Sequence, residues 1–233
     1  MRTKTLLIAA AALAAGLMVS SAQTYSQNVV GYVNLTLGTG FNMVANQLDA
    51  DGTGTNNTIA GVFSNSLPLN SSVYKYVSGG WVVSSYAKSG HGTGATTNWD
   101  ANGVLSANPG EGLFVSVPSP VTASVVGIVL QGSLSNPNIP PAGGFCLLSS
   151  QVPIAGDITT NLDYVPMLND QVYLWNPADN GGQGGFDTYS YAKSGHGTGA
   201  VTNWSPSLQI GVGEGLFLNT SAGSTWPVTF NVQ

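Results

Sequence analysis

A stretch of fifteen residues that occurs twice holds both histidines of the chain and two of the three lysines after residue 22. SYAKSGHGTGATTNW spans residues 85–99 and SYAKSGHGTGAVTNW spans residues 190–204, with Thr96 against Val201 as the only difference. Each copy supplies a phenol, an amine, an imidazole and an indole, and aromatic rings of this kind can lie against the faces of sugars. The candidate ligand-binding residues are therefore Tyr86, Lys88, His91, Trp99, Tyr191, Lys193, His196 and Trp204.

The same stretch also has a structural interpretation, because glycine-rich turns tolerate few substitutions. The flanking residues do not repeat: WVVS precedes one copy and FDTY precedes the other. Copying of the whole region therefore does not explain the identity, which requires local constraint or gene conversion. The constraint is either a backbone that needs these glycines or a ligand that contacts both loops, and the first is favoured.

Two groups of residues resemble partial metal sites. The two histidines, His91 and His196, are accessible imidazoles, but a zinc site needs three or four protein ligands and each copy offers one. DADGTGTNN at 49–57 alternates oxygen donors as calcium loops do, with Asp49 and Asp51 as candidate ligands. Ala60 stands where an EF-hand has its closing glutamate. A plain surface loop is favoured there, and we expect no cofactor.

The only two glutamates, Glu111 and Glu214, both lie in a GEG motif. Paired carboxylates can perform acid–base catalysis. Each glutamate belongs to a separate part of the chain, however, and nothing requires the two to meet. The sequence has no nucleophile-elbow, zinc-protease or phosphate-loop motif. We therefore expect no catalysis, with a polysaccharide hydrolase acting through Glu111 or His91 as the alternative.

The first 22 residues have the layout of a secretory signal peptide. MRTK is followed by the 14-residue apolar run LLIAAAALAAGLMV and then by small residues up to Ala22. A membrane-spanning helix needs roughly 20 apolar residues, so this run is short for an anchor. We expect cleavage after Ala22, a mature chain not inserted in a membrane, and a secreted, cell-surface or periplasmic location.

Charge narrows the classes of partner. After residue 22 the chain has three lysines and no arginine against ten carboxylates, a net charge of −7. Without a basic patch, binding to nucleic acid or to anionic membrane surfaces is not expected. Apolar residues make up 42% of the chain, which is too many for a disordered protein.

The chain also repeats on a larger scale. The repeated motifs are GFNMVANQ (40–47) with GFCLLSSQ (144–151), VYKY (73–76) with VYLW (172–175), GGW (79–81) with GGF (184–186), and GEGLF at 110–114 and 213–217. Their order is conserved and their offsets stay near 100 residues, which indicates tandem units. The predicted organisation is a signal peptide (1–22) and two β units (23–127 and 128–233).

These motifs are typical of strands. VYKYVSGGWVVSSYA predicts a hairpin around a Ser-Gly-Gly turn, and EGLFVSV and STWPVTFNV are rich in β-branched and aromatic residues. NNTIAGVF allows one short helical turn. The predicted fold is all-β, with two internally duplicated antiparallel sandwich-like or barrel-like units. Cys146, the only cysteine, excludes a disulfide framework and is expected to be a buried thiol.

GFNMVANQL, VYKY with GGW, and NPGEGLFV together resemble a module of secreted and surface bacterial proteins that is uncharacterised in function. VLQGSL, GGFCLLSSQVP, QVYLWN, VGEGLF and WPVTFNV resemble its usual companion. The resemblance implies a β-repeat fold and bacterial export. The fifteen-residue stretch is not part of the module's outline, and the module often carries polar residues other than glutamate in its G-x-G motif.

The sequence thus predicts a secreted, non-catalytic binding or structural module of a bacterial surface or matrix. Its expected partner is an extracellular glycan or a surface protein, contacted through the two copies of the repeated stretch. The alternatives are an extracellular polysaccharide hydrolase and a scaffold stabilised by calcium or zinc.

Overall fold

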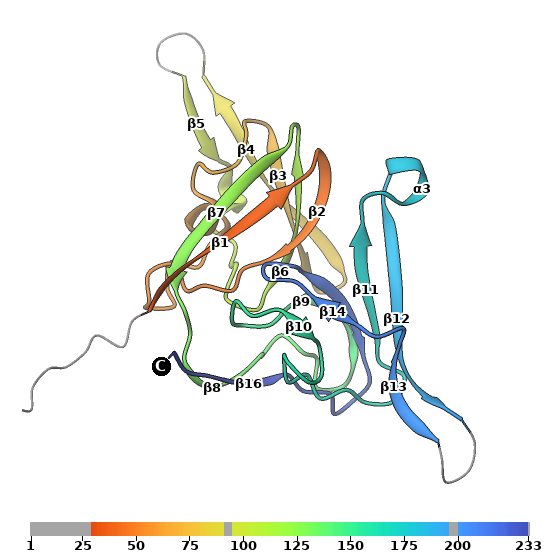
Figure 1. The fold of residues 1–233 in the computed structure, drawn as a ribbon. Coiled ribbons are helices and arrows are strands. Elements are labelled where there is room, and N and C mark those ends of the chain that lie inside the picture. The colour runs from red at the N-terminus through yellow and green to blue at the C-terminus, as the bar shows by residue number, and fades with distance from the viewer. Residues whose placement is uncertain (1–28, 91–94, 196–199, 233) are drawn as a thin grey trace, which may run out of the picture.

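The computed structural model describes residues 29–90, 95–195 and 200–232, so the predicted signal peptide lies outside the described residues. This part consists mainly of antiparallel strands (Figure 1), and the all-β prediction is confirmed. The N-terminal half contains β1 (Val30–Leu37), β2 (Gly40–Ala45), β3 (Ser71–Val77), β4 (Gly80–Ser89), β5 (Thr96–Trp99), β6 (Gly112–Val117) and β7 (Val121–Ile128). The C-terminal half contains β8 (Gly132–Ser135), β9 (Gly144–Leu148), β10 (Gly156–Asp157), β11 (Gln171–Asn176), β12 (Gly185–Ser194), β13 (Val201–Ser205), β14 (Gln209–Ile210), β15 (Leu216–Thr220) and β16 (Pro227–Phe230). The short helical segments are α2 (Ile59–Phe63), η2 (Ala101–Val104) and α3 (Asp179–Gly182).

Each half contains a five-stranded sheet, and the two sheets have the same order of equivalent strands. The order is β2-β6-β3-β4-β5 in the N-terminal half and β9-β15-β11-β12-β13 in the C-terminal half. A two-stranded pair accompanies each sheet, β1 with β7 and β8 with β16. Within the described residues both five-stranded sheets are open, so the sandwich-like form is adopted and the barrel-like alternative is not.

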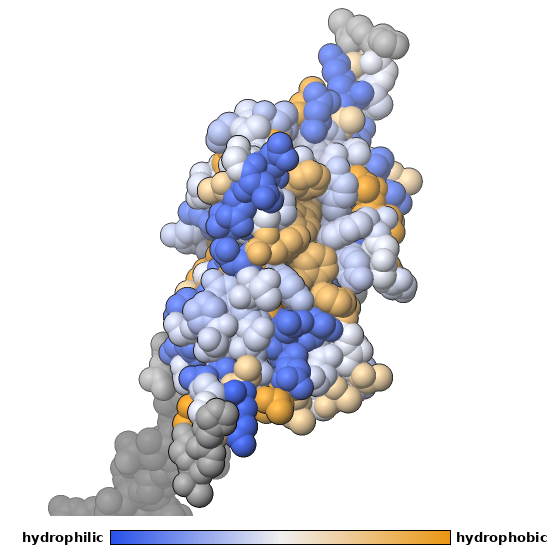
Figure 2. Space-filling view, turned by 90° about the vertical axis from the view of Figure 1, so that its right-hand side faces the viewer, coloured by the Kyte–Doolittle hydropathy of each residue, from blue (hydrophilic) through white to orange (hydrophobic). Residues whose placement is uncertain are grey.

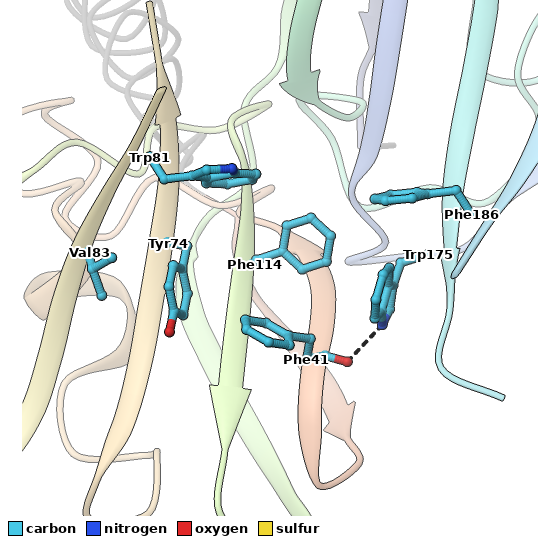
Figure 3. Close-up of a pocket in the computed structure, with 7 residues that line it drawn as sticks. All are labelled: Phe41, Tyr74, Trp81, Val83, Phe114, Trp175 and Phe186. Atoms are coloured by element: carbon cyan, nitrogen blue, oxygen red, sulfur yellow. Dashed lines mark hydrogen bonds between the residues drawn. The ribbon is translucent and has the colours of Figure 1, made fainter. Parts of the chain in front are cut away.

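Alternation along the strands gives each five-stranded sheet two apolar faces, because successive side chains point to opposite sides. In β3, Val73 is fully buried in the core of its half, whereas Tyr74 is only partly buried on the other face. In β6, Leu113 faces the core and Phe114 faces away from it. The faces with Tyr74 and Phe114 look toward the sheet of the C-terminal half (Figure 3).

Each half has its own hydrophobic core. In the N-terminal half, Leu35 and Val125 of the β1–β7 pair pack against the five-stranded sheet. In the C-terminal half, Tyr164 and Trp226 are each 1% exposed at the centre of the second core. Cys146 also lies in this core, and burial raises the pKa of its thiol to about 12. The predicted buried thiol is confirmed.

Local sequence explains the predicted hairpin and the helical turn. Ser78 and Gly79 connect β3 to β4 with φ angles of 50° and 82°, the mirror-image turn that matches the twist of paired strands. The side chain of Thr58 accepts the N–H of Gly61 and so caps α2, the one short helix expected in NNTIAGVF. Among the described residues, no helix has the length and apolar character needed to span a membrane.

Candidate functional site

The described parts of the repeated fifteen-residue stretch form the same pair of antiparallel strands in both halves. One copy ends β4 and forms β5, and the other ends β12 and forms β13. The two hairpins project from opposite ends of the molecule (Figure 1), so they do not combine into one site. His91 and His196 lie outside the described residues. Lys88 and Lys193 are exposed on the hairpin strands.

The tyrosine and tryptophan of each copy lie opposite one another at the hairpin base. The ring centroids of Tyr86 and Trp99 are 5.2 Å apart, and those of Tyr191 and Trp204 are 5.4 Å apart. Trp204 is only 7% exposed, and its indole N–H donates to the hydroxyl of Thr159 at 3.0 Å. The indole N–H of Trp99 donates to a backbone carbonyl at 2.8 Å. These tryptophans anchor the hairpins to the cores, and ligand contact by the exposed parts stays a prediction.

The candidate calcium loop is held together by its own hydrogen bonds. The buried carboxylate of Asp49 accepts the N–H of Gly54 at 3.0 Å and the amide of Asn57 at 3.1 Å. The backbone N–H of Thr53, followed by its hydroxyl, holds the pKa of Asp51 below its ordinary value. The described residues contain no group of three or more His, Cys, Asp or Glu side chains suited to a metal. These hydrogen bonds hold the loop in its conformation, and metal binding by Asp49 and Asp51 stays a prediction.

The two GEG motifs form equivalent turns that their own glutamates close. The glycine before each glutamate has a positive φ, 89° in one motif and 74° in the other. The carboxylate of Glu111 accepts the N–H of Asn108 at 2.8 Å, and that of Glu214 accepts the N–H of Gly211 at 2.7 Å. Both glutamates therefore have a structural role in a turn, which accounts for their recurrence without acid–base catalysis.

These turns also join the two halves. The N–H of Ala45 in β2 donates to the carbonyl of Gly213 at 2.9 Å, and the N–H of Ser149 after β9 donates to the carbonyl of Gly110 at 3.0 Å. The motifs place Ala45 and Ser149 at equivalent positions, as they do the two glycines. The contact is therefore reciprocal, like that between two subunits of a symmetric dimer.

The second glycine of each GEG motif allows this close approach. A Cβ atom on Gly112 would lie 2.8 Å from the backbone nitrogen of Leu148, and one on Gly215 would lie 2.4 Å from the carbonyl oxygen of Val44. Neither distance is compatible with a side chain. The motif GEGLF thus combines a turn, a docking position and a strand.

The reciprocal contact leaves an aromatic cleft between the two five-stranded sheets. Ten aromatic side chains line it, in five pairs of equivalent positions: Phe41 and Phe145, Tyr74 and Tyr173, Tyr76 and Trp175, Trp81 and Phe186, and Phe114 and Phe217. They come from strands of both halves, and an apolar surface is visible along the face of the molecule between these halves (Figure 2). We call this surface the aromatic cleft.

Two cavities of nearly equal size make up the centre of the cleft. One of about 380 Å³ lies mainly over the N-terminal sheet (Figure 3), and one of about 400 Å³ lies mainly over the C-terminal sheet. Trp81 and Phe186 line both cavities. The linings carry almost no polar surface, and the indole N–H of Trp175 is already engaged with the carbonyl of Phe41 at 2.8 Å.

The rings in the cleft pack mostly edge to face and remain partly open to solvent. The centroids of Phe114 and Trp175 are 5.3 Å apart at 87°, and the equivalent pair, Phe217 and Tyr76, is 5.3 Å apart at 88°. Four of the ten rings are between 42% and 51% exposed, namely Phe41, Trp81, Phe145 and Phe186. Exposed apolar side chains gathered in this way typically mark a binding surface.

A more polar cavity adjoins each central one. Glu214 lines a cavity of about 210 Å³ that shares Trp175 with one central cavity. Glu111 and Lys75 line a cavity of about 300 Å³ that shares Tyr76 with the other. The ammonium of Lys75 lies 3.0 Å from the carboxylate of Glu111, and both side chains are 13% exposed.

These aromatic residues lie in motifs that repeat in the sequence, but the sequence predicted no ligand contact for them. The spacing of the aromatic residues along the strands was a signal that could have revealed the cleft. Tyr74 and Tyr76 alternate with Val73 and Lys75, and Phe114 alternates with Leu113. A second apolar face on an antiparallel strand indicates that something other than the core covers that face.

No protein-family model matches this chain, and neither a curated protein nor a solved structure matches it.

Proposed function

We propose that this chain is an exported, non-catalytic binding module whose ligand lies in the aromatic cleft. The observation that carries the proposal is the gathering of ten aromatic side chains, five from each half, around two joined cavities. Small-molecule sites are typically concave, mostly apolar and about 300–1,000 Å³ in volume. Each central cavity has that character.

The lining favours an apolar ligand over a glycan at this place. Sugar hydroxyls removed from water need hydrogen-bond partners, and burying one without a partner costs about 1–3 kcal/mol. The central cavities offer almost none. Glycan contact through the repeated hairpins is a separate proposal, supported by the exposed residues Lys88 and Lys193, each two positions from a tyrosine on the same strand.

Export, duplication and family membership belong to the same proposal. The apolar leader before Ala22 supports secretion to the cell surface or beyond. The matching strand order of the two five-stranded sheets supports a duplicated unit. The shared motifs support membership of the bacterial β-repeat family that the sequence resembles. We expect the protein to act at a bacterial surface or in an extracellular matrix.

An uncharged fluorescent probe, N-phenyl-1-naphthylamine, tests the binding function. We expect saturable binding with enhanced emission, and loss of most of that binding in the double variant Trp81→Ala/Phe186→Ala. Tyr32→Ala is the matched control, since Tyr32 is a 73% exposed aromatic residue on β1, outside the cleft. No saturable binding, or equal loss in the control, would refute the assignment.

A further inference from the structure

The two ends of the aromatic cleft differ in charge, and we infer from this difference that the cleft prefers a cationic amphiphile. Such a ligand has an apolar body and a protonated amine at one end. The inference rests on the proposed function, because it places the apolar body on the rings of the central cavities.

The four cavities are neighbours that share lining residues. Trp81 and Phe186 connect the two central cavities. Trp175 connects one of them to the cavity of Glu214, whereas Tyr76 and Phe145 connect the other to the cavity of Lys75 and Glu111. We therefore place an elongated ligand on the rings with its head group toward one of the two polar cavities.

One polar end is neutralised and the other is not. The ammonium of Lys75 pairs with Glu111 at 3.0 Å. At the position equivalent to Lys75, the C-terminal half has Leu174, an apolar residue of the second core. Among the described residues lining the cavity of Glu214, this carboxylate is the only charged group. That end consequently keeps a negative charge.

Aromatic rings add a second preference for a cation. An ammonium over the face of a tryptophan, tyrosine or phenylalanine ring is attracted by the ring quadrupole. Trp175 lines both the central cavity and the cavity of Glu214, so the inference places the amine between this indole and the carboxylate of Glu214. A carboxylate or phosphate head group at the same place would meet the charge of Glu214 and no cation of the lining.

Three ligands with the same chain and different head groups test this inference. Decylammonium, decanol and decanoate, each below its critical micelle concentration, would compete with bound N-phenyl-1-naphthylamine. We expect decylammonium to bind about fivefold to tenfold more tightly than decanoate, with decanol between them. The expected ratio is modest because the head groups differ in one partly screened charge contact with Glu214. Glu214→Gln keeps an acceptor for the N–H of Gly211 and should remove most of that ratio.

Two further variants separate this charge from the overall negative charge of the protein. Asp163→Asn removes one exposed carboxylate outside the cleft and should leave the ratio unchanged. Leu174→Lys copies the pairing of Lys75 with Glu111 and should reduce the ratio as Glu214→Gln does. Equal affinities for the three ligands, or the same reduction in Asp163→Asn, would overturn the inference and leave the binding function standing. Failure of every decyl compound to displace a bound probe would overturn the inference alone, whereas failure of the probe to bind would refute the proposed function and the inference with it.

Discussion

Phe114 and Phe217 lie at equivalent positions of the two GEGLF motifs, and their ring centroids are 6.2 Å apart at the centre of the aromatic cleft. Each ring also contacts aromatic residues of the opposite half: Phe114 touches Trp175, and Phe217 touches Tyr76. The motif that docks the halves therefore also supplies the rings at the middle of the proposed binding surface. Docking of the halves and formation of the cleft depend on the same segment.

Close backbone approach at Gly215 gives the first prediction. An alanine Cβ there would lie 2.4 Å from the carbonyl oxygen of Val44, so we expect Gly215→Ala to lower the free energy of unfolding by roughly 1–3 kcal/mol through overpacking. Gly80→Ala is the control, because the nearest atom to its Cβ is 3.8 Å away. Urea denaturation measures both. Wild-type stability of Gly215→Ala would contradict the docking role.

The repeated hairpin should depend on its tryptophan more than on its lysine. We expect Trp204→Ala to lower the free energy of unfolding by about 3–5 kcal/mol, because it removes a large side chain from the second core. Exposed Lys193→Ala should change it by less than about 0.5 kcal/mol. Thermal and urea unfolding report the difference. Similar small effects for both variants would show that the tryptophan is not an anchor.

The pair of Lys75 and Glu111 should stabilise the N-terminal half. Lys75→Leu leaves the carboxylate of Glu111 partly buried without its cation, and we expect a loss of about 1–3 kcal/mol in the free energy of unfolding. Lys88→Leu, at an exposed position, is the matched control. The double variant Lys75→Leu/Glu111→Gln should recover part of the loss. A single variant as stable as the control would argue that the pair contributes little.

The buried thiol predicts a loss of stability at alkaline pH. Burial raises the pKa of Cys146 from 9.0 to about 12, so the folded state holds the proton more tightly than the unfolded state. This contribution is complete below pH 9 and disappears as the pH rises toward 12. Burial also raises the pKa of Tyr164, which adds to the effect above pH 10.

Stability measured between pH 8 and pH 11 checks this linkage. We expect the free energy of unfolding to fall over that range, and to fall less steeply in Cys146→Ala. The slopes are compared, because the substitution itself changes core packing. Equal slopes in the two proteins would contradict the assigned burial of the thiol.

The sequence predicted the strands better than it predicted what covers them. Alternation and turn residues were sufficient for the β3–β4 hairpin, for α2 and for the buried Cys146. The cleft was missed because Tyr74 and Phe114 are typical strand residues whichever face they occupy. Whether the second face meets solvent, a ligand or another sheet depends on how the halves dock, and no local pattern specifies this.

The glutamates show a similar limit. Acid–base chemistry by the GEG glutamates at 110–112 and 213–215 was only the alternative to a non-catalytic module, and the sequence predicted no role for them in a turn; the structure shows two turns closed by their side chains. Hydrogen bonds to Asn108 and Gly211 involve residues three positions back, so the turn interpretation was within reach of local sequence. The close approach across the two halves was not, because it joins segments far apart in the sequence: Gly112 with Leu148, 36 residues away, and Gly215 with Val44, 171 residues away.

Contact quenching of tryptophan emission tests the central claim most directly. Trp81 and Trp175 lie in the cleft, whereas Trp99, Trp204 and Trp226 belong to the cores. An apolar heavy-atom quencher, 1-bromodecane, should quench wild-type emission saturably, and Trp81→Phe/Trp175→Phe should lose nearly all saturable quenching while keeping aromatic cleft walls. Unchanged saturable quenching in that variant, or none in the wild type, would contradict binding in the aromatic cleft.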